Sequence, residues 1–125
     1  MNILLDTHVL LWWLDNPKVL SPSARESISN AENGVYVSLA TVWEIVIKKS
    51  LGKLSIPNDL PDAISTNGFA LLPLTLSHIL AVESLPLHHR DPFDRVLIAQ
   101  ALNENLTIAT RDADIMKYSV PHIPA

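Results

Sequence analysis

The feature that most constrains the fold is the alternation of short apolar runs with longer helix-like segments. Runs of strand length occupy residues 2–6 (NILLD), 35–38 (VYVS), 69–74 (FALLPL) and 106–110 (LTIAT). Because these runs are apolar throughout, they predict strands buried on both faces, as in a parallel sheet covered by helices. We therefore expect an α/β fold, a three-layer α/β/α sandwich with a short, mainly parallel central sheet.

The segments between these runs have helical patterns with recognisable ends. Ser21 and Ser38 are placed to cap two of the helices, while Gly34 and Gly52 are placed to end them. A helix or turn is expected at residues 7–14. Further helices are expected at 21–34, 39–51, 57–68, 75–85 and 92–104, with a helical turn at 111–118 and an edge strand at 120–125.

Length and composition predict one domain, spanning residues 1–125. Nothing approaches the run of about 20 apolar residues that spans a bilayer, and the first residues lack a basic leader, so we expect no membrane segment and a cytoplasmic location. The absence of cysteine fits that location.

A net charge of −4 argues against a protein that coats nucleic acid, but it allows a nucleic-acid enzyme whose acids hold metal.

Three acids are predicted to share one edge of the sheet. Ligands of parallel sheets bind beyond the carboxyl ends of the strands. Asp6 closes the first predicted strand, and Asp112 lies two residues past the strand at 106–110. Asp94 lies in the first turn of the helix that precedes this strand. Acids that are far apart in the sequence are thus expected to meet in space.

Asp91 and Asp94 stand at the start of the same helix, in the stretch RDPFDRVLIAQA. Asp91 precedes Pro92, which fits a helix cap followed by proline at the first helical position. Asp94 shares helical spacing with three apolar residues and so continues the buried face. It is either an acid favoured by the helix dipole or a functional carboxylate, and the spacing leaves both interpretations open.

The other acids also have two interpretations each. Asp6 can cap the following helix, although its apolar neighbours predict partial burial, which favours an acid that binds a cation. Glu44 can pair with Lys48 four residues on, or it can line a cleft on a narrow polar face. Asp112 can cap a turn, and the hydroxyl of Thr110 can orient a carboxylate or a metal-bound water.

A cluster of carboxylates suits Mg²⁺ or Mn²⁺, because hard cations prefer oxygen ligands. Such ions support hydrolysis of phosphodiesters. The basic residues beside the acids are either a solubilising surface or candidates to position phosphate: Arg90, Arg95, Arg111 and Lys48. The five histidines lack zinc-binding spacing, and adjacent His88 and His89 would point apart in a strand. With three glycines, the chain has no Gly-rich phosphate loop.

Three blocks carry a family resemblance: LLDTHVLLW (4–12), SLATVWEIVIKKSLGKL (38–54) and HHRDPFDRVLIAQALNENLTIATRD (88–112). Together with the total length, they resemble the PIN-domain family, and more narrowly the toxin ribonucleases of VapBC-type toxin–antitoxin pairs. The resemblance covers nearly the whole chain. It implies the PIN fold, a parallel sheet between helices, and hydrolysis of single-stranded or looped RNA.

The resemblance also implies a set of site residues. The four acids that match the family's catalytic and metal-binding positions, with Mg²⁺ or Mn²⁺ as the cofactor, are Asp6, Glu44, Asp94 and Asp112. Thr7 matches the small polar residue after the first acid, and Thr110 matches the hydroxyl companion of the last. Asp91 belongs to the subgroup that carries the HRDPFDR block, where His8 is also found in place of serine or asparagine.

As partners, the resemblance implies a cognate antitoxin that occupies the cleft and a second copy of the chain. Trp12 and Trp13 are candidates for the dimer contact, unless they belong to the core. Two other functions are considered beside the toxin ribonuclease. One is a non-catalytic PIN-fold module that binds RNA or protein, and the other is a different metal-dependent nuclease or phosphoesterase.

Overall fold

The computed structural model describes residues 1–56 and 59–125 and shows a single five-stranded sheet. All strand pairs are parallel, in the order β3-β2-β1-β4-β5. The strands are β1 (Asn2–Leu5), β2 (Gly34–Ser38), β3 (Ala70–Leu72), β4 (Thr107–Thr110) and β5 (His122–Pro124). The predicted α/β class and parallel sheet are confirmed, and the tail forms the expected edge strand.

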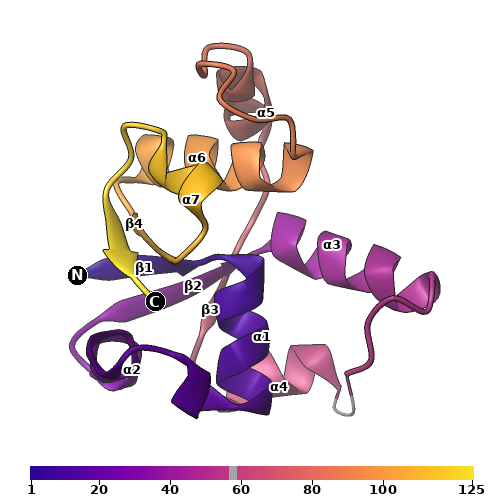
Figure 1. Cartoon of the computed structure of the whole chain (residues 1–125), viewed down its shortest axis with the longest axis vertical. Coiled ribbons are helices and arrows are strands. Elements are labelled where there is room, and N and C mark those ends of the chain that lie inside the picture. The colour runs from indigo at the N-terminus through magenta and orange to yellow at the C-terminus, as the bar shows by residue number, and fades with distance from the viewer. Residues whose placement is uncertain (57–58) are drawn as a thin grey trace.

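Helices connect the strands and cover both faces of the sheet (Figure 1). The helices are α1 (Thr7–Asp15), α2 (Pro22–Ser29), α3 (Leu39–Ser50), α4 (Leu60–Thr66), α5 (Leu76–Val82), α6 (Pro92–Glu104) and α7 (Ala113–Met116), with a 3₁₀ turn at Pro17–Val19. In Figure 1, α1, α2 and α4 lie on one side of the sheet, and α5, α6 and α7 lie on the other.

Side-chain alternation along the strands explains the three layers. Ile3 and Leu5 pack into a core cluster with α1 and α2, whereas Leu4 packs into a second cluster with α6 and α7. In β4, Ala109 and Ile108 divide between the two clusters in the same way. Because successive residues of a strand point to opposite faces, an apolar run is needed to fill both layers.

Local sequence signals set several helix boundaries as expected. The hydroxyl of Ser21 accepts a hydrogen bond from the backbone N–H of Ala24, and Ser38 accepts one from Ala40. These caps satisfy N–H groups that have no partner within the helix. After α3, Gly52 adopts a positive φ of 71°, which glycine reaches without a steric penalty.

The predicted helix end at Gly34 is wrong, because α2 already ends at Ser29. Gly34 is instead the first residue of β2, where its N–H donates to the carbonyl of Met1. Several other elements are shorter than predicted. β3 covers three residues of 69–74, α4 begins at Leu60 and α5 already ends at Val82. The helical turn α7 covers four residues and the edge strand β5 covers three. Residues 57 and 58 of the predicted helix 57–68 lie outside the described residues.

Within residues 1–56 and 59–125, none of the helices combines the length and the apolar character that crossing a lipid bilayer requires.

Candidate functional site

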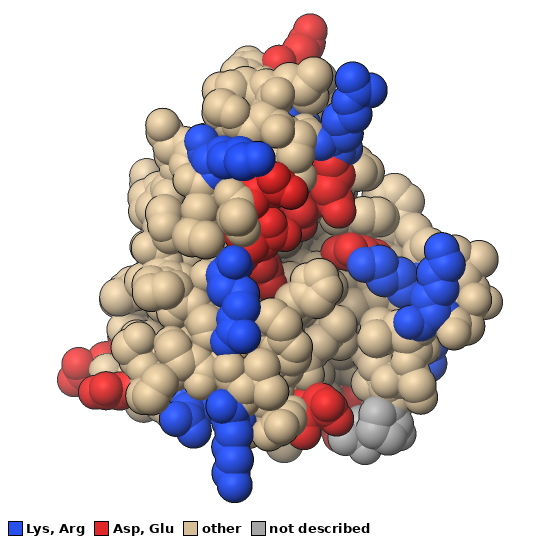
Figure 2. Space-filling model, viewed as in Figure 1, with Lys and Arg blue, Asp and Glu red and all other residues tan. Residues whose placement is uncertain are grey.

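The parallel sheet brings acids from four separate segments to the edge formed by the carboxyl ends of its strands. Asp6 follows β1 directly, and Asp112 lies two residues after β4. Glu44 lies in α3, which starts where β2 ends, and Asp94 lies in the first turn of α6. Figure 2 shows acidic side chains gathered in a hollow between the α6–α7 side, α1 and α3, with Lys and Arg side chains around it.

Asp6 is both a helix cap and a buried acid. One carboxylate oxygen accepts from the backbone N–H of Val9 at 2.8 Å, which caps α1. The other accepts from the hydroxyl of Thr110 at 2.6 Å. The residue is only 3% exposed, and burial raises the pKa of its carboxyl, with a smaller contribution from the negative charge of Asp112. The structure therefore confirms the helix cap at Asp6 and the predicted burial of this acid.

Glu44 is buried on the side of α3 that faces α1, although it forms the predicted ion pair. Its two carboxylate oxygens accept from the hydroxyl of Thr7 at 2.6 Å and from Nζ of Lys48 at 2.8 Å. Glu44 is 4% exposed, whereas the side chain of Lys48 is 41% exposed, so the pair joins a buried carboxylate to a partly exposed ammonium group. The hydrogen bond to Glu44 is the main cause that raises the pKa of Lys48. The negative charges of Asp91 and Asp94 contribute less to this rise.

Asp94 carries the most perturbed carboxyl of the group. Burial is the main cause that raises its pKa to about 6, and the neighbouring charges of Asp91 and Asp112 add to it. The imidazole of His89 lies 3.1 Å from one of its oxygens and opposes this shift. Asp91 is the predicted cap, because its side chain accepts from the backbone N–H groups of Phe93 and Asp94.

Asp112 caps the short helix α7 through a 2.8 Å hydrogen bond from the backbone N–H of Asp114. Its own N–H donates to the hydroxyl oxygen of Thr110 at 3.0 Å. Because the same hydroxyl donates to Asp6, Thr110 joins the first and last acids of the set. The sequence predicted a role for this hydroxyl beside Asp112, and the structure shows that it serves Asp6 as well.

The four acids supply the oxygen ligands that a hard cation prefers, but they are not gathered around one point. Among the residues that the structure describes, no group of three or more His, Cys, Asp or Glu side chains is arranged to hold a metal ion. Mg²⁺ does not need three protein ligands, because it keeps several waters and is commonly held by one or two carboxylates. The raised pKa values of Asp6 and Asp94 show that this edge disfavours negative charge when no cation balances it.

The basic residues divide into those near the acidic hollow and one that is buried. The guanidinium of Arg111 lies 4.4 Å from the ring centroid of Trp12 and donates to the carbonyls of Val19 and Ala125. Arg90 is exposed on the segment before α6. Arg95 differs from the other three, because it is 9% exposed and donates inward to the carbonyls of Val82 and Pro86.

Sequence reasoning missed His89 and Tyr118 as neighbours of the acids. His89 lies on the segment before α6 and contacts the carboxylate of Asp94 and the hydroxyl of Tyr118. Metal-binding spacing in the sequence cannot reveal a histidine that binds a carboxylate. The one available signal is that His89 lies five residues before Asp94, within reach once Pro92 starts the helix.

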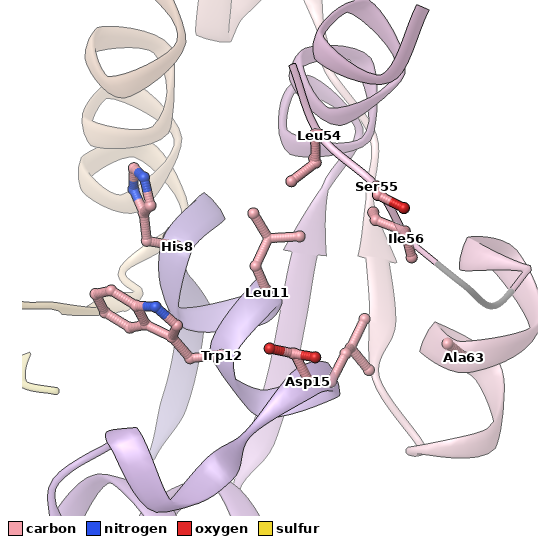
Figure 3. Close-up of a pocket in the computed structure, with 9 residues that line it drawn as sticks. His8, Leu11, Trp12, Asp15, Leu54, Ser55, Ile56 and Ala63 are labelled. Carbon is pink, nitrogen blue, oxygen red and sulfur yellow. The ribbon is translucent and has the colours of Figure 1, made fainter. Parts of the chain in front are cut away.

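Two adjoining hollows lie beside the acids and share His8 and Trp12. The smaller, about 230 Å³, is also lined by Asp6, Arg111 and Asp112. The larger, about 290 Å³, lies between α1 and the segment at 54–56 and is mainly apolar. Figure 3 shows Leu11 and Asp15 of α1 on one side of it, with the 54–56 segment on the other.

Comparisons with known proteins agree on the fold. The family model of the PIN domain matches residues 3–120. The chain is 27% identical over 128 residues to a protein of Mycobacterium tuberculosis named Ribonuclease VapC22, covering 96% of this chain and 94% of that protein. One similar solved structure is VapBC of Salmonella typhimurium bound to DNA, with a TM-score of 0.71 and 14% identity, covering 99% of this chain and 98% of that chain. Another is FitAcB of Neisseria gonorrhoeae, with a TM-score of 0.66 and 23% identity, covering 97% of this chain and 96% of that chain.

Proposed function

The chain belongs to the PIN-domain family, and on that premise we propose that it is a metal-dependent endoribonuclease acting as the toxin of a toxin–antitoxin pair. The observation that carries this proposal is the meeting of acids from four segments at one sheet edge, with Asp6 and Glu44 almost fully buried. Burying a carboxylate costs free energy of folding unless the charge is paired or binds a metal ion. The name of the ribonuclease relative supports the choice of RNA as substrate.

The proposed ligands of Mg²⁺ or Mn²⁺ are Asp6, Glu44, Asp94 and Asp112. When bound, the ion supplies Lewis acidity that activates water and offsets charge at the scissile phosphate. The chain's own part is to orient the carboxylates before the ion arrives. Thr110 fixes Asp6 and Thr7 fixes Glu44, each through a 2.6 Å hydrogen bond from its hydroxyl. Fixed ligands reduce the reorganisation that binding would otherwise cost.

The RNA backbone is proposed to approach along the cations that border the acids. Lys48 pairs with Glu44, and the charges of Asp91 and Asp94 help to raise its pKa, so it is near enough to the acids to meet a phosphate oxygen once a divalent ion offsets them. Arg111 lines the smaller hollow together with Asp6 and Asp112. Arg90 is the third candidate because it is exposed on the segment that leads into α6. Such contacts position the backbone and do not read base sequence.

The antitoxin is proposed to dock in the apolar hollow of Figure 3. This hollow offers Leu11 and Leu54 to an apolar side chain, and it opens toward the acids through the shared residues His8 and Trp12. A partner seated there would cover the entry to the catalytic edge. The similar structures from Salmonella typhimurium and Neisseria gonorrhoeae are VapBC and FitAcB assemblies, which supports an antitoxin as the partner.

A homodimer is proposed to form through an apolar face made by α3 and α5. Its exposed side chains are Leu39, Trp43, Val46, Leu76, Ile79 and Leu80. An apolar hollow of about 330 Å³ lies between the two helices and α6. The Trp12–Trp13 pair fits this role less well. The indole of Trp13 donates to Asn67 and packs on Phe69, while Trp12 lies under Arg111.

One observation favours a second candidate, a PIN-fold module that binds RNA or protein without cleaving it. In the described ranges, no three of the acids are arranged to hold one metal ion. Titration with Mn²⁺ separates the two candidates, because the binding module predicts no saturable uptake of the ion.

The experiment that tests the proposed function is RNA cleavage with and without Mg²⁺ or Mn²⁺. Asp6→Asn and Asp94→Asn should each abolish the metal-dependent cleavage while leaving the fold intact. Glu32→Gln, an exposed acid outside the site, is the matched control and should cleave like the parent. Labelled single-stranded DNA and a phosphate monoester, offered beside RNA, identify a different phosphoesterase if either is hydrolysed in preference.

A further inference from the structure

Asp94 is held by a chain of hydrogen bonds that begins at the buried guanidinium of Arg95. Nη1 of Arg95 donates to the hydroxyl oxygen of Tyr118 at 2.9 Å. That hydroxyl lies 2.9 Å from Nδ1 of His89, and Nε2 of His89 lies 3.1 Å from a carboxylate oxygen of Asp94. Four side chains therefore form one connected path that ends on a candidate metal ligand.

The chemistry of the end groups fixes the two ends of this path. A guanidinium can only donate, so the oxygen of Tyr118 accepts from Arg95. An ionised carboxylate can only accept, so Nε2 of His89 carries a proton and donates it to Asp94. The hydroxyl of Tyr118 and Nδ1 of His89 form the hydrogen bond between these ends.

The base of the path is firmly anchored. Arg95 also donates to the carbonyls of Pro86 and Val82, which joins α6 to the end of α5 and the segment after it. Tyr118 is 4% exposed, and its ring makes an edge contact with the imidazole of His89 at 5.4 Å between centroids. Packing and hydrogen bonds together leave His89 little freedom to turn away from Asp94.

The same arrangement recurs at two other acids of the site. Thr110 donates to Asp6, and Thr7 donates to Glu44, in each case at 2.6 Å. Each of these carboxylates is thus oriented by one side-chain donor from a neighbouring element. His89 supplies the corresponding donor for Asp94, from the segment that precedes α6.

We propose that His89 is a positioning residue that orients the carboxylate of Asp94 for cation binding, with Tyr118 and Arg95 as its support. The proposal rests on the proposed function, since it concerns the same site. It also explains why Arg95 is buried beside the acidic edge. Its role there is to hold Tyr118, which holds His89.

The test measures Mn²⁺ affinity by calorimetry and RNA cleavage for three variants. His89→Ala should weaken Mn²⁺ binding by about 10- to 100-fold, the usual cost of removing a group that orients a metal ligand. His89→Gln should recover most of the loss, because its amide N–H can still donate. His88→Ala is the matched control. His88 is exposed and contacts the edge of the same tyrosine at 4.8 Å between centroids, and it should bind like the parent.

The Mn²⁺ affinities of the three variants decide whether His89 positions Asp94. A loss in His89→Ala that His89→Gln restores and His88→Ala does not share supports the positioning role. Parental affinity in His89→Ala, an equal loss in His88→Ala, or no recovery in His89→Gln overturns it while the proposed function stands. If the parent protein itself neither binds Mn²⁺ nor cleaves RNA, the proposed function fails and the positioning role fails with it.

Discussion

The hydroxyl of Thr110 donates a 2.6 Å hydrogen bond to the carboxylate of Asp6 and so ties the carboxyl end of β4 to that of β1. Both side chains are almost fully buried. Burial raises the pKa of Asp6, and the hydrogen bond from Thr110 partly opposes this rise by stabilising the ionised carboxylate. Thr110 therefore has a measurable structural role beside its proposed part in the site.

Replacing Thr110 with valine should destabilise the metal-free protein. Valine keeps the shape of threonine but removes the donor to Asp6, and leaving a buried polar group unpaired costs about 1–3 kcal/mol. Thr110→Ser, which keeps the hydroxyl, is the control and should lose less. Urea denaturation measures both variants at neutral pH. Equal stability of the valine and serine variants would show that the hydrogen bond to Asp6 contributes little.

The stability of the metal-free protein should rise as the pH falls from about 7 to about 5. The pKa of Asp94 is about 6 in the fold and 3.8 as its ordinary value, so the folded state binds the proton more tightly than the unfolded chain. The shift of about two pKa units corresponds to at most about 3 kcal/mol. We expect protonation of Asp94 to raise the free energy of unfolding by about 1–2 kcal/mol, because Asp94 interacts with neighbouring acids and the proton uptake is divided among them.

Asp94→Asn is the control for this dependence. The amide cannot ionise, so this variant should be more stable than the parent at pH 7.5 and should lose most of the rise toward pH 5. Urea denaturation in the presence of a chelator gives both values. A parent protein whose stability is flat, or falls, between pH 7 and 5 while Asp94→Asn behaves identically contradicts the assigned pKa.

A charged residue in the apolar face of α3 should convert the proposed dimer to a monomer. Trp43 is 59% exposed and packs against Phe93 at 5.2 Å between ring centroids. Trp43→Asp places a charge where the partner's apolar side chains would lie, which is costly to bury. Met116→Asp, on α7, is the control. Light scattering coupled to chromatography reads the mass, and a parent protein that is monomeric at all concentrations rules out this interface.

Much of the fold follows from local signals in the sequence. Apolar strands, hydroxyl or carboxylate caps and the positive φ of Gly52 depend on residues within one turn of each other, so they could be predicted. The prediction that Gly34 ends α2 is wrong, because Gly34 pairs with Asn2 of β1 in the sheet and donates to the carbonyl of Met1. The sequence contains no local sign of that pairing.

The site was predictable to the same extent. Acids at the ends of predicted strands can be located in the sequence. A parallel sheet brings these strand ends to one edge, so their proximity could be predicted. The contacts of Arg95 and His89 were not predictable, because their shared partner Tyr118 comes from a distant segment, and the carbonyls of Val82 and Pro86 reach Arg95 only through the fold of the segment before α6. A charged residue in a helix is usually exposed, and only tertiary contacts could show that Arg95 is buried.

The central claim is that four acids at one sheet edge together bind a divalent cation. The most direct measurement is calorimetric titration of Mn²⁺ into the parent protein and into Asp6→Asn, Glu44→Gln, Asp94→Asn and Asp112→Asn at pH 7.5. We predict saturable binding by the parent and an affinity at least about tenfold weaker in each variant, because each removes one charged ligand of the site. No saturable binding by the parent, or parental affinity in all four variants, would contradict the claim.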